Sequence, residues 1–221
     1  MRTRPTRGGY GLVLVLIVGT YVLALSAQHR WMIAVLLFVQ TGTVWQALRV
    51  SGARTGVRLA AAVVFVLALV GAVLNVVAGD SPLIGWTFLA ASALYLLAPF
   101  SIVRDLGTHR GVDPQTMLGA LAAYLLIGMA FGFGYACLAA IQPGPLFGDG
   151  GDPSLSEALF FSFVTMTTTG YGDLVPVANP AQSIAVLEAL TGQLFLVTAV
   201  AKVVENWRPR AWNSRKDQTR P

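Results

Sequence analysis

The chain has 221 residues, of which 55% are apolar and only 11% are charged. This composition excludes an ordinary soluble domain and predicts an all-α protein that crosses a membrane several times. The formal net charge of +5 requires no nucleic-acid partner, because basic residues gather in the cytoplasmic loops of membrane proteins.

Six apolar runs predict transmembrane helices, each of which needs about 20 mostly apolar residues. They cover residues 11–27, 31–48, 58–78, 83–100, 114–141 and 181–204. The first run could also be a signal peptide, because arginines precede it and small residues follow it. However, it is long for a signal peptide, and the next run begins almost at once. A retained helical hairpin is therefore favoured.

The basic residues indicate an orientation. With six spans and a cytoplasmic N-terminus, all of the 15 lysines and arginines except Arg30 fall on the inner side of the membrane, in loops, tails or the inner ends of spans. We therefore expect a multi-pass protein of the cell membrane with both termini in the cytoplasm. The outer loops instead carry Asp80, Asp149, Asp152 and Asp173, an acidic surface that would attract cations.

These patterns divide the chain into three parts. Residues 1–113 form a four-helix transmembrane domain, residues 114–205 contain the last two spans, and residues 206–221 form a short basic cytoplasmic tail. The tail carries two tryptophans and several basic residues, which could anchor it to anionic lipids of the bilayer.

No sequence feature points to an enzyme or to a bound cofactor. There is no nucleophile–base pair, phosphate-binding loop or metal-ligand spacing. Cys137 lies inside an apolar run, where packing is the favoured role.

A short helix is predicted between the fifth and sixth spans. Ser154 can cap it, and Glu157, three residues later, completes a capping box. The apolar run at residues 158–166 is too short to span a bilayer. Irregular backbone at membrane depth is tolerated only where it lines a water-filled path or is buried in protein. We therefore expect a re-entrant helix followed by a loop.

Residues 165–173, with the sequence TMTTTGYGD, form that loop. The carbonyls of residues 168–171 and the Thr168 hydroxyl would form stacked oxygen rings around an axis shared by several chains. Successive carbonyls point inward only if the backbone alternates between mirror-related dihedrals. Gly170 and Gly172 lie where a positive φ is needed. Such rings can replace the water shell of a potassium ion.

With these residues, the chain resembles the potassium channel pore family, specifically a bacterial six-span channel without a charged voltage-sensing fourth helix. The resemblance covers residues 114–205 as outer helix, pore helix, filter and inner helix, which together make a pore domain. It implies passive, selective conduction by a homotetramer, because one filter motif per chain cannot close a pore. It also implies that Gly192 is a gating hinge. The implied filter residues are Thr168, Thr169, Gly170, Tyr171 and Gly172, with K+ bound at the first four.

The sequence departs from many members of the family at two places. Thr169 stands where valine is common, and it adds a hydroxyl group. Phe160 and Phe161 stand where many relatives have tryptophans that hydrogen-bond the filter. Phenylalanine has no such donor, so Tyr171 and Asp173 need other partners.

Glu188 is the one carboxylate inside a predicted span, about one helical turn before Gly192. Two interpretations are open. Glu188 could support the filter through Thr165 or Thr167, with protonation that tunes conduction, or it could be a hydrogen-bonded structural acid at a subunit contact.

Voltage sensing requires basic residues at every third position of the fourth span, each contributing about 2.3 kcal/mol per 100 mV. Residues 83–100 contain no arginine or lysine, so we expect weak voltage dependence. Two alternatives to a selective channel are a non-selective cation channel and a potassium transporter subunit. The intact Gly-Tyr-Gly at residues 170–172 disfavours the first, and the absence of an internal repeat disfavours the second.

Overall fold

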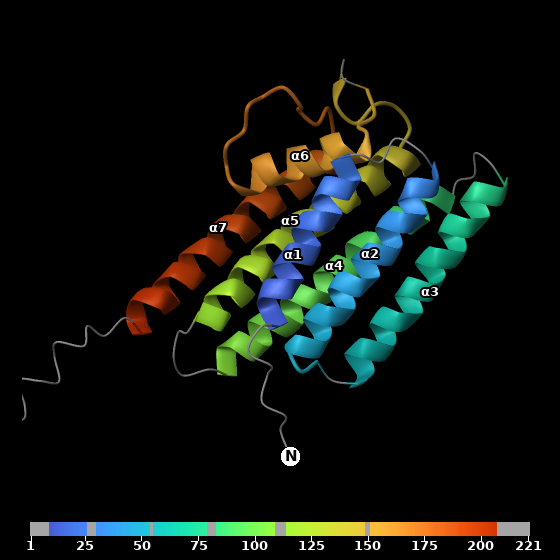
Figure 1. Ribbon diagram of the computed structural model, residues 1–221. Coiled ribbons are helices and arrows are strands. Elements are labelled where there is room, and N and C mark those ends of the chain that lie inside the picture. The colour runs from blue at the N-terminus through green and yellow to red at the C-terminus, as the bar shows by residue number, and fades with distance from the viewer. Residues whose placement is uncertain are drawn as a thin grey trace, which may run out of the picture.

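The computed structural model describes residues 9–25, 30–53, 55–78, 83–108, 114–148 and 151–206. Within these ranges every regular element is a helix (Figure 1). The helices are α1 (Gly9–Leu25), α2 (Arg30–Val50), α3 (Thr55–Ala78), α4 (Leu83–Thr108), α5 (Pro114–Ile141), α6 (Leu155–Met166) and α7 (Ala181–Asn206).

The helices lie where the sequence predicts them, with one clear difference at the end of α4. This helix continues through Pro99 to Thr108, whereas the apolar run ends at residue 100. Proline removes only one intrahelical hydrogen bond here. The extra turns are anchored because Ile102 is fully buried and the Ser101 hydroxyl lies 2.8 Å from that of Ser51.

Three of the described helical segments are long and apolar enough to cross a membrane: Gly85–Arg104, Pro114–Ile141 and Ala181–Lys202. Shorter apolar stretches occur in α1, α3 and α6. The structure therefore supports a membrane-spanning, all-helical protein, whereas the count of six spans stays a prediction.

The long helices run up and down beside one another, and α6 lies across the end of the bundle where α5 ends and α7 begins (Figure 1). α4 packs along α5, α1 packs between α2 and α5, and α3 packs on the outer side of α2 and α4. Only residues 109–113 separate α4 from α5 in the sequence. The N-terminal helices therefore pack against α5 of their own chain.

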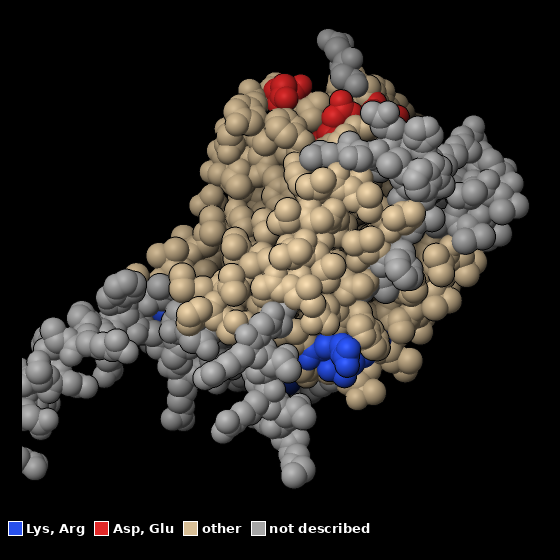
Figure 2. Space-filling view, viewed as in Figure 1, with Lys and Arg blue, Asp and Glu red and all other residues tan. Residues whose placement is uncertain are grey.

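Exposed charged side chains separate to the two ends of the bundle. Figure 2 shows the acidic side chains at the end that holds α6, and the described lysines and arginines at the opposite end. Arg49 and Arg58 flank the turn between α2 and α3, whereas Asp152 and Glu157 lie at the start of α6. The lateral surface between the two ends is apolar, which suits a helix bundle in a bilayer.

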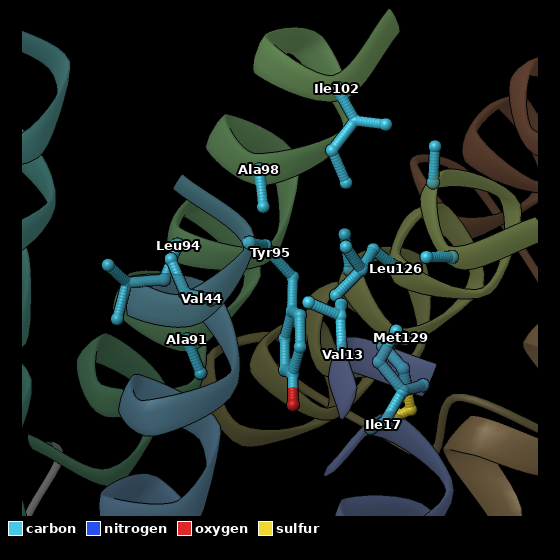
Figure 3. Close-up of a cluster of buried hydrophobic side chains, with 14 of the residues drawn as sticks. Val13, Ile17, Val44, Ala91, Leu94, Tyr95, Ala98, Ile102, Leu126 and Met129 are labelled. Atoms are coloured by element: carbon cyan, nitrogen blue, oxygen red, sulfur yellow. The ribbon is translucent and has the colours of Figure 1, made fainter. Parts of the chain in front are cut away.

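One hydrophobic core joins the N-terminal helices to α5, and Tyr95 lies at its centre (Figure 3). Val13 from α1 and Val44 from α2 lie around the Tyr95 ring, with Leu126 from α5. The same ring stacks on Phe133 with centroids 5.6 Å apart. The division into a four-helix domain and a pore domain stays a prediction, but this core shows that the two parts are closely packed.

Two glycines of α5 let α6 approach closely. A Cβ at Gly132 would lie 3.0 Å from the Cα of Leu159, and one at Gly128 would lie 2.7 Å from the Phe163 ring. Gly128 and Gly132 therefore serve packing within one subunit.

Gly132→Ala should destabilise the fold, because the new methyl group would push the α6 backbone away from α5. We expect a loss of about 1–3 kcal/mol, typical of overpacking. Thermal unfolding of the purified protein in detergent measures it. Gly134→Ala is the matched control, because on the same helix its Cβ would meet nothing closer than 3.7 Å. Equal stability of the two variants would contradict the close α5–α6 contact.

Candidate functional site

The N-terminus of α6 is fixed by the capping box that the sequence predicts. The Ser154 hydroxyl accepts a hydrogen bond from the Glu157 backbone N–H, and the Glu157 carboxylate accepts one from the Ser154 N–H at 2.8 Å. The Ser154 hydroxyl also donates to this carboxylate at 2.7 Å. These bonds hold the pKa of Glu157 below its usual value.

The C-terminus of α6 is fixed by contacts from both neighbouring long helices. Met166 is fully buried, and its carbonyl accepts a long hydrogen bond (3.4 Å) from the Tyr124 hydroxyl of α5. A Cβ at Gly192 of α7 would lie only 2.6 Å from the Met166 carbonyl oxygen. Gly192 thus has a packing role in an unbroken α7, and the hinge expected there stays a prediction.

The backbone after α6 alternates in the way that stacked carbonyls need. Gly170 has φ +53° and Gly172 has φ +84°, the positive values expected from the sequence. Thr168 also has a positive φ, +57°, which is rare for a β-branched residue. Positive φ therefore recurs at every second residue from 168 to 172. A strained non-glycine backbone of this kind costs about 1–3 kcal/mol and is typical of functional sites.

Hydrogen bonds hold the base of this segment. The Thr168 N–H donates to the Thr165 carbonyl at 3.0 Å, and Gln193 of α7 donates to the Thr168 hydroxyl at 3.4 Å. The hydroxyl of Thr169, where valine is common in the family, lies 2.9 Å from that of Thr167. The departure at Thr169 therefore adds a polar contact behind the backbone.

The two phenylalanines of α6 have different positions. Phe160 lies parallel to the Tyr171 ring, with centroids 6.0 Å apart and an interplanar angle of 1°. Phe161 instead packs against Tyr135 of α5 and Phe147 of the preceding loop. Tyr171 therefore has an aromatic partner in place of a hydrogen bond from tryptophan.

Asp173 is exposed, and it forms no hydrogen bond with another residue in the described part of the chain.

Glu188 is fully buried, with 0% of its surface exposed. Its Oε2 accepts a hydrogen bond from the Tyr135 hydroxyl at 2.8 Å, and its Oε1 lies in a short contact with the Ser162 hydroxyl. One interpretation of the sequence expected Thr165 or Thr167 as the partner of Glu188. The structure instead gives Tyr135 and Ser162. The reason is the crossing of α6 and α7, which faces Glu188 toward the middle of α6 rather than its end.

Four further residues join the site in three dimensions: Tyr124, Tyr135, Ser162 and Gln193. A buried carboxylate requires hydrogen-bond donors, so the hydroxyl residues on neighbouring helices were candidate partners of Glu188 in the sequence. Sequence spacing alone could not choose among them.

The filter segment and most of α7 lack cover within one chain. Residues 167–173 are exposed, and the Tyr171 side chain is 70% exposed. In α7 only 11% of the apolar span is buried, compared with 61% in α5. An exposed polar loop beside an exposed apolar helix is the surface that an assembly would cover.

Ser154→Ala should remove the cap of α6 and cost about 1 kcal/mol of stability at neutral pH. The pKa of Glu157 should rise toward its ordinary value. Because the native pKa is lowered, the stabilisation is present above the ordinary pKa and is lost as the pH falls. The difference between wild type and variant should therefore narrow in acid, as measured by thermal unfolding. Ser154→Thr, which keeps a capping hydroxyl, should restore stability, and no rescue would contradict the capping role.

Comparison with known proteins bears on residues 119–207, which match the model of a family described as ion channel. A stretch of 59 residues is 42% identical to the inward rectifier potassium channel Kirbac3.1 of Paramagnetospirillum magnetotacticum, covering 26% of this chain and 20% of that protein. A stretch of 101 residues is 32% identical to the Shaker-related potassium channel tsha2 of Oncorhynchus mykiss, covering 46% of this chain and 20% of that protein.

The chain thus matches 20% of the length of each relative. No solved structure matches the chain. The family match nevertheless covers nearly all of α5, and the whole of α6, the filter segment and α7. This part of the chain therefore matches an ion channel family, and its similarity to two relatives named as potassium channels supports a potassium channel pore.

Proposed function

We propose that the chain is one subunit of a potassium-selective channel, in which four copies surround a common axis and conduct K+ passively. The observation that carries the proposal is the alternation of φ at residues 168–172, at the end of a buried, capped pore helix. A backbone in this conformation can direct successive carbonyls to one side, where they replace the water shell of an ion.

The ion-binding groups in this proposal are the carbonyls of Thr168, Thr169, Gly170 and Tyr171, with Gly172 completing the segment. They lie beyond the C-terminal end of α6, where the helix dipole carries partial negative charge. That charge would favour a cation in the cavity below the filter. No catalytic step is needed, because conduction requires only that ions enter and leave.

The proposal of a homotetramer is supported by the surfaces that a single chain leaves uncovered. A filter exposed on one side and an α7 helix exposed along its length would be covered by the same surfaces of neighbouring copies. Repetition of one such contact around an axis closes a ring. Four is the number that the resemblance to the pore family implies.

The proposed orientation of the protein in the cell membrane is supported by the separation of acidic and basic residues between the two ends of the bundle. Acidic residues at the α6 end would face outward, and the basic end of the bundle would face the cytoplasm with both termini (Figure 2). The proposed contact of the basic tail with anionic lipids involves residues 207–221, which lie outside the described residues.

In planar bilayers with asymmetric K+ and Na+ solutions, the purified protein should give a reversal potential close to the potassium equilibrium potential. Gly170→Ala should abolish or degrade this selectivity, because the positive φ at this position costs a non-glycine residue about 1–2 kcal/mol. Gly144→Ala is the matched control. It has a positive φ of +85° as well, but lies in the loop before α6.

A reversal potential midway between the K+ and Na+ values would contradict selectivity and support a non-selective cation channel. Loss of selectivity in both glycine variants would show that general destabilisation, rather than the filter backbone, explains the effect.

Channel opening should depend weakly on voltage. The part of α4 that spans the apolar layer packs Ala91, Tyr95 and Ala98 into the core, and the sequence there has no arginine or lysine to move in the field. The measurement is the open probability of single channels from strongly negative to strongly positive voltages. A steep conductance–voltage curve would refute this expectation.

A further inference from the structure

We propose that Glu188 is a neutral carboxylic acid whose proton completes a hydrogen-bonded junction between α5, α6 and α7 behind the filter. The junction consists of Glu188, Tyr135, Ser162 and the Gly128 carbonyl. Glu188 is a positioning residue in this account, since it touches no proposed ion ligand. Its effect on conduction rests on the proposed channel function, whereas its protonation state does not.

The number of available hydrogens supports the neutral form. The Ser162 hydroxyl lies 2.7 Å from the Gly128 carbonyl and in short contact with Glu188 Oε1, but a hydroxyl has only one hydrogen to donate. If Glu188 carries a proton on Oε1, it donates to Ser162, and Ser162 donates to Gly128. Tyr135 then donates to Oε2. An ionised Glu188 has no hydrogen to donate, so the single Ser162 hydrogen could then bond to Glu188 or to the Gly128 carbonyl but not to both.

The charges around Glu188 also favour the neutral form. α5 faces it with Tyr124 and Tyr135 and contains no charged residue. The charged residue of α6 is Glu157, in the first turn, and the nearest basic residue along α7 is Lys202, about 21 Å away along the helix axis. Because Glu188 is fully buried within its own chain, a neighbouring copy cannot reach it. A buried carboxylate without a cation costs several kcal/mol.

The junction is in register with the packing at the end of α6. Glu188 and Gly192 lie one turn apart on one face of α7, and they meet Ser162 and Met166, one turn apart on α6. Loss of the proton would remove one bond of this contact and place a charge beside α6. The support of the filter is therefore present at low and neutral pH and is lost as the pH rises.

Infrared spectroscopy of the purified protein in lipid tests the protonation directly. At neutral pH the wild type should show the carbonyl stretch of a protonated carboxylic acid, and Glu188→Gln should remove it. The control is Glu157→Gln, which removes an exposed carboxylate and should leave the band unchanged. Tyr135→Phe and Ser162→Ala should shift the band without removing it, because each changes one hydrogen bond.

The band of the wild type should disappear reversibly at alkaline pH, which tests the proposal even if no variant folds. Absence of a band at neutral pH in the folded wild type, or a band that persists in folded Glu188→Gln, would overturn the proposal. Neither result depends on whether the protein conducts K+.

Current recordings then test the consequence for conduction. Wild-type current should fall roughly tenfold from neutral to alkaline pH, the size expected when one buried hydrogen bond is lost. Glu188→Gln should retain current without this fall, because its amide reproduces the donor and acceptor of the neutral acid. Glu157→Gln should keep the wild-type pH profile. A wild-type current that is unchanged in alkali, together with loss of current in folded Glu188→Gln, would contradict the positioning role.

Discussion

Helix α6 has only 12 residues, too few to cross a bilayer, so the proposed filter after it depends on the packing of α6 against the long helices, chiefly α5 and α7. That packing depends on close backbone approach. Gly128 and Gly132 admit α6 on one side, and Gly192 admits Met166 on the other. A methyl group at any of these glycines would meet α6 at less than the usual contact distance. The position of the filter backbone therefore follows from three small residues on two long helices.

Polar contacts also fix the position of α6 within this close packing. The Ser154 cap fixes one end of α6, and the bonds of Glu188 to Ser162 and Tyr135 fix its middle. Tyr171 stacks on Phe160, so an aromatic contact replaces a hydrogen bond from tryptophan. Such contacts are worth about 0.5–1.5 kcal/mol each. Together they can hold a backbone that alternates into positive φ and carries strain at residues 168–172.

The sequence predicted features that depend on neighbours in the chain. The helix positions, the cap at Ser154 and the positive φ at Gly170 all follow from local chemistry or composition. The partners of Glu188 did not follow, because they depend on how α6 crosses α7. The positive φ of Thr168 did not follow either, since threonine disfavours it, and in the structure it accompanies the hydrogen bond from the Thr168 N–H to the Thr165 carbonyl. The end of α4 did not follow either, because the apolar run ends at residue 100 whereas packing of Ser101 and Ile102 extends the helix to Thr108.

In the proposed channel, several copies of this chain bring the backbone of residues 168–171 around one axis. Electron cryomicroscopy of the protein purified in lipid, in potassium solution, tests it most directly. We expect a fourfold assembly in which the carbonyls of residues 168–171 face the axis, with separate peaks of density between successive oxygen rings. A monomer, a dimer, or a ring in which these carbonyls face away from the axis would contradict it.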